Sequence, residues 1–470
     1  MSKSPDLLIL GGGTGGYVAA IKAAQQGMSV TLVEKDKLGG TCLHKGCIPT
    51  KALLRSAEIY DSVKKAEEFG IESKEKSVVN FQKVQERKQA IVDQLHKGVQ
   101  GLVAKNKVKV LNGTGVVMGP SIFSPVSGAV IVTFEDGEEE ILTPKKLLIA
   151  TGSTPKSLPS LPLDEEYILS SDGMLELEEL PEKIAIVGGG VIGSEWASLL
   201  NSLGVEVTII EYLDRILPTE SKSISRVFKK EIEAKGIKVQ VNSEVKSAKV
   251  DKKKQKVELL YNDDEKLVVD QVMVAVGRKP NIDSIGLMNT SIKYDDKGIH
   301  VNDFYQTAED HIYAIGDCID TLQLAHVATK EGEIAVKHMA EEYVEPLNYI
   351  NVPRATYSSP EIASVGYTKE NVPEDKKVKI GNFPFAGNGK ALIHGDSAGF
   401  VEVLRDEETD DLLGVSIIGP HATELIAEVS TALYMDASPM EIGDAIHAHP
   451  SLSEATMEAA LDTYQLAIHK

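Results

Sequence analysis

The sequence contains the same glycine-rich unit twice, and this repeat constrains the fold more than any other feature. In each copy a short apolar run is followed by a Gly-x-Gly-x-x-Gly turn, a stretch of helical character and a second apolar run that ends in a glutamate. The first copy spans residues 7–34 and the second spans residues 184–211. This order of strand, glycine turn, helix and strand is that of a nucleotide-binding βαβ unit. One such pattern is weak evidence, but two copies with the acid at the same offset predict two dinucleotide-binding domains.

The glycines and the acid of each copy have separate expected tasks. The first glycine permits a tight turn, the second lets the backbone approach a pyrophosphate, and the third lets the helix pack closely on the strand. The helix N-terminus then holds the phosphates, and the closing acid binds ribose hydroxyls. In the first copy these residues are Gly11, Gly13, Gly16 and Glu34. In the second copy they are Gly188, Gly190, Gly193 and Glu211.

Glu211 also indicates which nucleotide the second copy binds. An acid at this place prefers a free 2′-hydroxyl, whereas a 2′-phosphate requires arginines. Only Arg215 is close by in the sequence. NAD is therefore predicted rather than NADP.

A third feature is also repeated, and proline clusters suggest where domains meet. The apolar runs 147–152 and 272–277 each end in a small-residue turn that is followed by a proline. Prolines cluster again within residues 152–182 and 346–353. We expect a first nucleotide-binding domain at residues 1–150, a second at 151–280, a central domain at 281–350 and a C-terminal α+β domain at 351–470.

Periodicity predicts the remaining elements. Helices are expected between residues 56 and 106, and short strands between residues 108 and 133. In the last domain, strands are expected at 400–404 and 413–418 and helices at 423–435 and 453–467.

Length and charge exclude several classes of protein. A chain of 470 residues is too long for one ordinary core and suggests about three domains. The net charge of -20 disfavours nucleic acid and anionic membranes as partners. The N-terminal apolar run is too short for a secretion signal, and no apolar stretch approaches the length of a membrane span. A cytoplasmic location is therefore expected.

The three cysteines, Cys42, Cys47 and Cys318, are too few for a structural disulfide framework. Cys42 and Cys47 directly follow the first nucleotide unit and precede helical sequence. If the first cysteine lies at a helix start, the sulfurs approach bonding distance and the positive helix end lowers the thiol pKa. Two buried thiols or half a metal site are alternatives, although no other cysteine stands at ligand spacing for zinc. Cys318 is expected to be a small buried residue.

A histidine and an acid near the C-terminus form a second candidate group. Pro450 keeps His449 out of a helix, and Glu454 could orient and charge-stabilise its imidazole. An isolated histidine is more often structural, but thiol chemistry needs a proton acceptor. We expect His447 to be structural or to support the site indirectly.

Taken in order, these segments resemble the pyridine nucleotide–disulfide oxidoreductases over essentially the whole chain. The matching segments are the first glycine turn and residues 39–51, 150–152, 188–195, 314–317, 324–326 and 449–454. The resemblance implies an α/β fold with two Rossmann-like domains, of the glutathione-reductase type, and a C-terminal α+β dimerisation domain. It also implies FAD in the first nucleotide site, NAD in the second, and a redox-active pair of Cys42 and Cys47.

The resemblance further implies roles for individual residues. Lys51 would lie beside the flavin, paired with Glu195, because a cation near the ring stabilises reduced flavin. The residues expected at FAD, besides the first glycine turn and Lys51, are Gly115, Gly152, Gly316, Asp317 and Ala325. Gly277 would join the second turn at NAD.

The members that the chain resembles most oxidise protein-bound dihydrolipoyl groups and reduce NAD, as the shared dehydrogenase component of 2-oxo acid dehydrogenase complexes. By this resemblance His449, polarised by Glu454, takes a proton from the dithiol, the thiolate attacks Cys42, and Cys47 delivers electrons to FAD. The expected partners are lipoyl domains, the core acyltransferase of such a complex, and a second copy of this chain that supplies His449. At His44 the chain resembles members that are tied to branched-chain substrates.

Other functions are weighed against this expectation. Glutathione reductase shares the cysteine pair but normally uses NADP, against which Glu211 argues. Mercuric reductase carries a C-terminal cysteine pair, and no cysteine follows Cys318 here. A single-cysteine NADH oxidase or peroxidase would not need Cys47. A docking component with little redox activity would not need the intact set of cysteines, histidine and acid.

Overall fold

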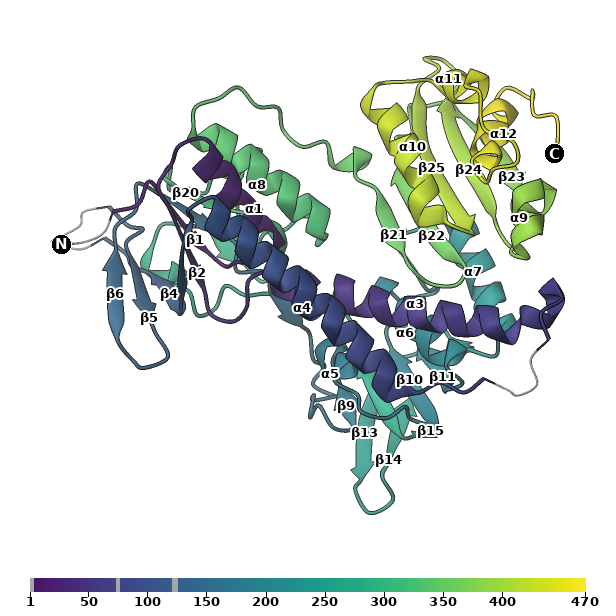
Figure 1. Ribbon diagram of the computed structural model, residues 1–470, viewed down its shortest axis with the longest axis horizontal. Helices are drawn as coiled ribbons and strands as arrows, with labels where there is room; N and C mark the ends of the chain where they lie inside the picture. Colours follow the sequence, from purple (N-terminus) through teal and green to yellow (C-terminus); the bar gives the residue numbers. More distant parts are fainter. Residues whose placement is uncertain (1–3, 73–76, 121–125) are drawn as a thin grey trace. The chain divides into compact units, whose positions relative to one another are not determined.

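The computed structural model describes residues 4–72, 77–120 and 126–470, which form two compact units (Figure 1). The first unit contains the chain up to Leu53, Gln82–Lys156 and Gly277–Leu347. The second contains Leu54–Phe81, Ser157–Val276 and Asn348–Lys470. Each unit therefore combines segments that are distant in the sequence.

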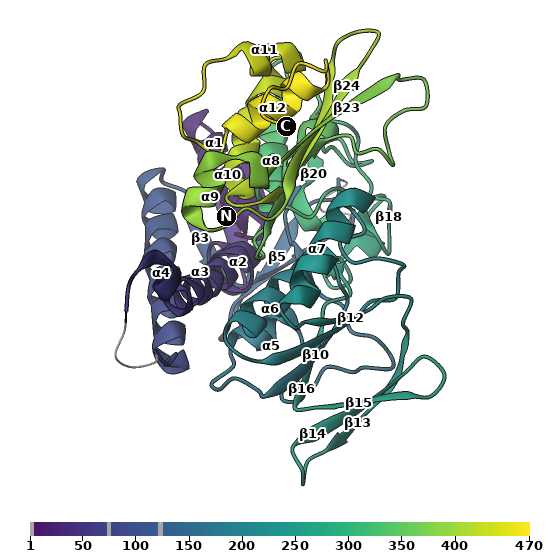
Figure 2. The same cartoon turned by 90° about the vertical axis from the view of Figure 1, so that its right-hand side faces the viewer.

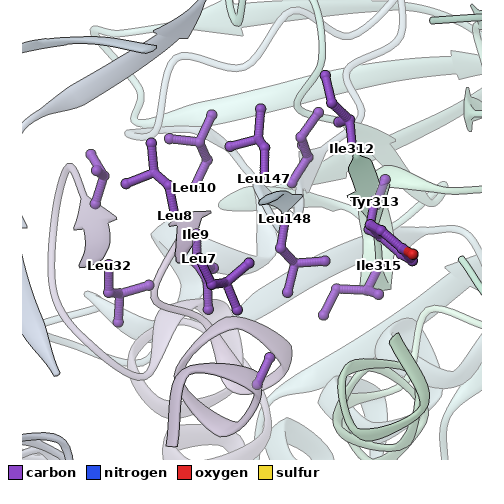
Figure 3. Packing of buried hydrophobic residues seen from close by; sticks show 14 of the residues in the cluster. Leu7, Leu8, Ile9, Leu10, Leu32, Leu147, Leu148, Ile312, Tyr313 and Ile315 are labelled. Carbon is purple, nitrogen blue, oxygen red and sulfur yellow. The ribbon is translucent and has the colours of Figure 1, made fainter. Parts of the chain in front are cut away.

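The first unit is built on a five-stranded parallel sheet with the order β20-β7-β1-β2-β3. The strands are β1 (Leu7–Leu10), β2 (Val30–Glu34), β3 (Lys109–Asn112), β7 (Lys146–Ile149) and β20 (Ile312–Ala314). Helices α1 (Thr14–Gln25) and α8 (Ala325–Met339) pack against each other beside it. Apolar side chains project from both faces of β1, β7 and β20, as Figure 3 shows, because helices and loops cover both faces of a parallel sheet. Strand β20 brings the central segment of the chain to the edge of the first nucleotide fold.

Smaller elements complete the first unit. The segment after β2 forms the short helix α2 (Gly40–His44) and the start of α3 (Cys47–Lys64), which continues into the second unit. Helix α4 (Phe81–Lys105) follows. Strands β4 (Thr114–Val117), β5 (Val130–Thr133) and β6 (Glu139–Leu142) form an antiparallel sheet. The remaining pieces are β8 (Ser153–Pro155), β17 (Arg278–Pro280), β18 (Tyr294–Asp295), β19 (Gly298–Ile299) and the 3-10 turn Gly316–Cys318. The expected helices and strands of this region are confirmed, except that part of the range 108–133 lies outside the described residues.

The second unit begins with another parallel sheet, of order β12-β11-β10-β16-β9. Its strands are β9 (Ile168–Leu169), β10 (Lys183–Val187), β11 (Glu206–Ile210), β12 (Lys238–Gln240) and β16 (Gln271–Val274). The helices are α5 (Ser171–Leu175), α6 (Val191–Ser202) and α7 (Lys222–Ala234), and β13 (Val245–Asp251), β14 (Lys256–Tyr261) and β15 (Glu265–Val269) form an antiparallel meander. The order β12-β11-β10-β16 repeats the order β3-β2-β1-β7. The predicted internal repeat is therefore confirmed.

The C-terminal part of the second unit is an α+β domain, as expected. Its antiparallel sheet has the order β21-β22-β25-β24-β23. The strands are β21 (Arg354–Thr356), β22 (Glu361–Gly366), β23 (Val378–Pro384), β24 (Phe400–Asp406) and β25 (Leu412–Gly419). The helices α9 (Gly389–His394), α10 (Ala422–Tyr434), α11 (Pro439–Asp444) and α12 (Glu454–Asp462) accompany them (Figure 2).

The last helix is shorter than the sequence predicts. The expected range 453–467 is wrong at its end, because α12 stops at Asp462. The Thr463 hydroxyl donates to the carbonyl oxygen of Ala460 at 2.7 Å, and Gln465 has a left-handed φ of 64°. Side-chain bonding to nearby backbone and a left-handed residue both terminate helices.

No helix of the described ranges is long and apolar enough to cross a membrane.

Candidate active site

The first glycine turn leaves an open space in front of helix α1. A Cβ on Gly11 would lie 2.2 Å from the Ala150 oxygen, and one on Gly16 would lie 1.9 Å from the Gly11 oxygen. The backbone of the protein itself therefore requires these two glycines. Gly13 is different, because its φ is an ordinary -67° and the nearest atom to a Cβ there is 3.9 Å away.

The second turn repeats this geometry in front of helix α6. A Cβ would lie 2.4 Å from Ala275 oxygen at Gly188 and 2.0 Å from Gly188 oxygen at Gly193. At Gly190, with a φ of -72°, it would meet nothing within 4 Å. Helices α1 and α6 have no side-chain cap and no acidic residue in the first turn. Their N–H groups can therefore receive an anion, and the middle glycine of each turn leaves room for it, which fits a dinucleotide pyrophosphate at both turns.

The two closing acids hold the glycine turns. Glu34 accepts the N–H of Gly12 at 2.6 Å on one carboxylate oxygen and that of Asp36 at 2.7 Å on the other. Glu211 accepts the N–H groups of Gly189 at 2.6 Å and Leu213 at 2.7 Å in the same way. Sequence reasoning missed this structural role. Each carboxylate oxygen has a second lone pair, so the expected ribose contact stays a prediction.

Two further glycines stand in turns that require them, and a third packs against the core. Gly152 and Gly277 have φ of 69° and 109°, a region that glycine enters readily. A Cβ on Gly115 would lie 2.5 Å from Leu10 Cδ2, so packing accounts for this glycine. Its expected position near the adenine stays a prediction.

Asp317 belongs to a polar group near the end of β20. Its carboxylate accepts the Ser153 hydroxyl at 2.5 Å and lies 3.9 Å from Arg278 Nε. The N–H of Gly316 donates at 2.6 Å to Glu331, a fully buried carboxylate that also accepts the Thr321 hydroxyl at 2.8 Å. Sequence reasoning missed Glu331, although one acid inside the apolar face of an otherwise buried helix was a signal for it.

Ala325 begins helix α8, and the N-cap residue Leu324 has no side chain that could accept a hydrogen bond. Like α1 and α6, this helix lacks an acidic residue in its first turn. Its N–H groups therefore suit an electron-rich part of a cofactor.

The cysteine pair lies beside the first glycine turn. Gly39 forms a parallel bridge with Gly13, and its N–H donates to Gly12 oxygen at 2.8 Å, which places α2 against the turn. Cys42 lies in α2, and Cys47 is the first residue of α3. Cys42 thus lies in the first turn of the short helix α2, whereas Cys47 itself begins a helix. Both cysteines are free thiols of intermediate exposure.

The two thiols share a hydrogen bond, and this bond changes the acidity of Cys42. The hydrogen bond with Cys47 raises the pKa of Cys42 well above its usual range, and burial and the negative charge of Cys47 raise it further. A hydrogen bond from Thr14 and the charge of Lys51 oppose this shift. The expectation of a lowered pKa is wrong for Cys42, because the hydrogen bond with Cys47 and burial outweigh the effects of Thr14 and Lys51.

Lys51 and Glu195 belong to different units. Lys51 lies one turn after Cys47 on α3, which explains the effect of its charge on Cys42. Glu195 is buried in α6 and accepts the N–H of Tyr357 at 2.9 Å. Their expected pairing stays a prediction.

The structure brings His449 and Glu454 together, as expected. His449 Nδ1 lies 2.9 Å from one carboxylate oxygen of Glu454, and the other oxygen accepts the Ser451 N–H at 2.8 Å. The His449 side chain is 82% exposed in the isolated chain. Because the Nδ1–H group donates a hydrogen bond to the carboxylate, Nε2 is the nitrogen that can accept a proton.

Cys318 is fully buried, as predicted, and its thiol donates to Ile315 oxygen at 3.1 Å. Burial raises its pKa to about 12. It is therefore an inert thiol.

Two dinucleotide-binding folds, a dithiol beside the first glycine turn and a histidine–carboxylate pair define a nucleotide-dependent thiol–disulfide oxidoreductase. The chain belongs to the pyridine nucleotide-disulphide oxidoreductase family, whose model matches residues 5–332, and the dimerisation domain of the same family matches residues 352–460. The resemblance in the sequence is thus confirmed. FAD and NAD are the cofactors of such enzymes, as the two turns predict.

Relatives with named activities match the whole chain. A dihydrolipoyl dehydrogenase of Bacillus subtilis is 51% identical over 100% of both chains, and a second one of that organism is 43% identical over 98% of this chain and 99% of the relative. The mitochondrial dihydrolipoyl dehydrogenase of Pisum sativum is 39% identical over 100% of this chain and 93% of its own. The crystal structure of LpdA from Mycobacterium tuberculosis has a TM-score of 0.90 and 26% identity, and the alignment covers 98% of this chain and 99% of LpdA.

Proposed function

We propose that this protein is a dihydrolipoyl dehydrogenase, which oxidises protein-bound dihydrolipoyl groups to lipoyl and reduces NAD. The observation that carries the proposal is the hydrogen-bonded pair of Cys42 and Cys47 beside the first glycine turn. A dithiol at this place can exchange electrons with a cofactor held by the turn. The full-length similarity to dihydrolipoyl dehydrogenases supports the choice of substrate.

At the start of the reaction, Cys42 and Cys47 are joined by a disulfide bond. Nε2 of His449 takes a proton from one substrate thiol, and Glu454 stabilises the imidazolium that forms. The substrate thiolate attacks Cys42, which breaks the disulfide and releases the Cys47 thiolate. The second substrate thiol then attacks the sulfur bound to Cys42 and its proton passes to Cys42, so that cyclic lipoyl leaves and Cys42 becomes a thiol.

The acidity of Cys42 suits this last step. Its raised pKa means that Cys42 takes up a proton readily once its bond to the substrate sulfur breaks. Bound FAD would supply the capacity to accept two electrons from the dithiol and to pass them on to NAD as hydride. Lys51 and Glu195 would lie beside that cofactor.

The cofactor-binding residues follow from the two turns. FAD would be held by Gly11, Gly13, Gly16 and Glu34, with Lys51, Gly115, Gly152, Gly316, Asp317 and Ala325. NAD would be held by Gly188, Gly190, Gly193, Glu211 and Gly277. We assign residues 1–150 to FAD binding, 151–280 to NAD binding, 281–350 to completion of the FAD site and 351–470 to the subunit interface. The position of β20 at the edge of the first sheet supports the third assignment.

The working form would be a homodimer in the cytoplasm. The match to a dimerisation domain supports the dimer, as do the exposed side chains of His449 and Ile446, the latter fully exposed in the isolated chain. In the dimer His449 of the partner subunit would serve the cysteine pair. The further partners would be lipoyl domains and the core acyltransferase of a 2-oxo acid dehydrogenase complex, with a branched-chain complex as one candidate.

One assay tests the proposed function. The FAD-loaded protein is mixed with dihydrolipoamide and NAD, and formation of NADH is followed by absorbance. NADP in place of NAD, and glutathione in place of dihydrolipoamide, are the controls. We expect rapid reduction of NAD with dihydrolipoamide alone. A protein whose flavin is reduced by NADH but which does not oxidise dihydrolipoamide would contradict the proposal.

A further inference from the structure

His447 makes two hydrogen bonds with groups that only accept. Its Nδ1 lies 2.8 Å from the carbonyl oxygen of Ala445, and its Nε2 lies 2.8 Å from a carboxylate oxygen of Glu428 on helix α10. The His447 side chain is 6% exposed, whereas that of Glu428 is 36% exposed. The neighbouring Ile446 side chain points outward and is fully exposed. His447 thus ties this loop to helix α10.

The two acceptors determine how many protons the ring carries. A neutral imidazole has one N–H and could satisfy only one of them, whereas an imidazolium donates from both nitrogens. The alternative places the second proton on Glu428. That arrangement is disfavoured, because a partly exposed carboxylic acid gives up its proton more readily than an imidazolium does. An imidazolium at His447, with Glu428 as its counter-charge, is therefore the form in which both contacts are hydrogen bonds.

This buried cation acts on the histidine–carboxylate pair of the active site. Burial by itself would raise the pKa of Glu454, but hydrogen bonds from the Ser451 N–H and His449, with the charges of His449 and His447, lower it below its usual value. An ionised Glu454 keeps the proton of His449 on Nδ1, and Nε2 remains the acceptor. His447 lies two residues before His449 on the same loop, so the same contacts also set the place of the loop.

We propose that His447 is a positioning residue for the thiol oxidation: paired with Glu428, it anchors the loop that carries His449 and places a positive charge near the pair of His449 and Glu454. The inference rests on the proposed function. The titratable groups that face His447 are Glu428 of α10 and Glu454 of α12, with His449 on its own loop. The carboxylate that anchors the loop is therefore a different one from the carboxylate of the catalytic pair.

Two variants of the FAD-loaded protein test the proposal. His447→Gln removes the cation, and Glu428→Gln removes the carboxylate that favours it. The matched control is Glu424→Gln, an exposed acid one turn earlier on the same helix. The measurement is kcat/KM for dihydrolipoamide with NAD as a function of pH. We expect kcat/KM of both variants, at their optimum pH, to be about tenfold lower than that of the unmodified protein. This loss is a fraction of what a general base supplies.

The pH profile separates positioning from a merely structural role. The reaction needs neutral His449, so activity rises with pH along an acid limb. Removal of a nearby positive charge makes protonation of His449 easier, so this limb should move to higher pH by about half a unit. Simple disorder of the loop would break the bond between His449 and Glu454 and move the limb to lower pH.

The outcomes that would contradict the role of His447 are distinct from those that would contradict the proposed function. Reduction of the flavin by NADH, followed by rapid mixing, shows that each variant is folded and loaded. If the unmodified protein passes this test but does not oxidise dihydrolipoamide, the proposed function itself fails. If it does oxidise dihydrolipoamide, and the limb in both variants stays in place or moves to lower pH, the role of His447 is wrong. If His447→Gln does not fold, Glu428→Gln decides alone.

Discussion

Replacing Gly190 with alanine asks whether the second glycine turn is shaped by the protein or by a nucleotide. Gly190 has φ -72° and ψ -170°, which any residue can adopt, and a Cβ there would meet nothing within 4 Å. Gly193, three residues later, offers the opposite case, because its Cβ would lie 2.0 Å from Gly188 oxygen. The same methyl group should therefore have different consequences at the two positions.

The expected magnitudes follow from these distances. Gly190→Ala should leave the free energy of unfolding unchanged or raise it by about 0.4–1 kcal/mol, because alanine restricts the unfolded chain. If a pyrophosphate approaches Gly190, the methyl group overpacks the site and costs about 1–3 kcal/mol of binding. That cost corresponds to a roughly 5- to 150-fold loss of NAD affinity. Gly193→Ala should lower the free energy of unfolding by about 1–3 kcal/mol, because backbone stands in the way.

Two measurements on FAD-loaded protein check these values. Urea unfolding without NAD reports the free energy of unfolding, and titration with NAD, followed by the fluorescence of the oxidised flavin, reports affinity. Gly98→Ala in helix α4 is the control, since its Cβ also meets nothing within 4 Å and it lies in neither glycine turn. The reasoning is refuted if Gly190→Ala binds NAD like the unmodified protein, or if it loses as much stability as Gly193→Ala.

The remaining predictions concern the reaction and the choice of nucleotide. Cys42→Ser should abolish dihydrolipoamide oxidation, because serine cannot form the disulfide, and normal turnover would exclude the disulfide mechanism. His449→Gln should lower lipoamide-linked turnover by about 10²–10⁴-fold while NADH still reduces the flavin; equal losses in the two assays would remove its role as base. Glu211→Ala leaves the N–H groups of Gly189 and Leu213 without their acceptor, so it should cost about 1–3 kcal/mol of stability and weaken NAD binding. Unchanged NAD binding in this variant would mean that Glu211 does not select the nucleotide.

Local patterns made much of the fold predictable. The apolar run, glycine turn and helix of each repeat lie within about thirty residues of sequence, and their conformations depend on each other rather than on distant segments. Both nucleotide-binding units, and two strands of the sheet in the last domain, are therefore where the sequence predicts them. The pairing of His449 with Glu454 was predictable for the same reason, since a turn and a helix start connect them.

Contacts between distant segments were not predictable in this way. The bridge from Gly39 to Gly13 positions α2, and the break between α2 and α3 places Cys47 at a helix start. The raised pKa of Cys42 depends on its hydrogen bond with Cys47 and on burial, which only the three-dimensional structure provides. Glu331 and the pair of His447 and Glu428 join residues whose partners no spacing rule indicates.

By itself, the sequence determined that this protein has two dinucleotide folds, a dithiol and a histidine–carboxylate pair. These features depend on short-range sterics and hydrogen bonding between residues that are close in the sequence. Only the tertiary structure decided that the pKa of Cys42 is raised, which glycines leave room for a ligand, and which acid pairs with His447. These properties depend on burial and on distances between groups far apart in the chain, and electrostatic energies change steeply with both.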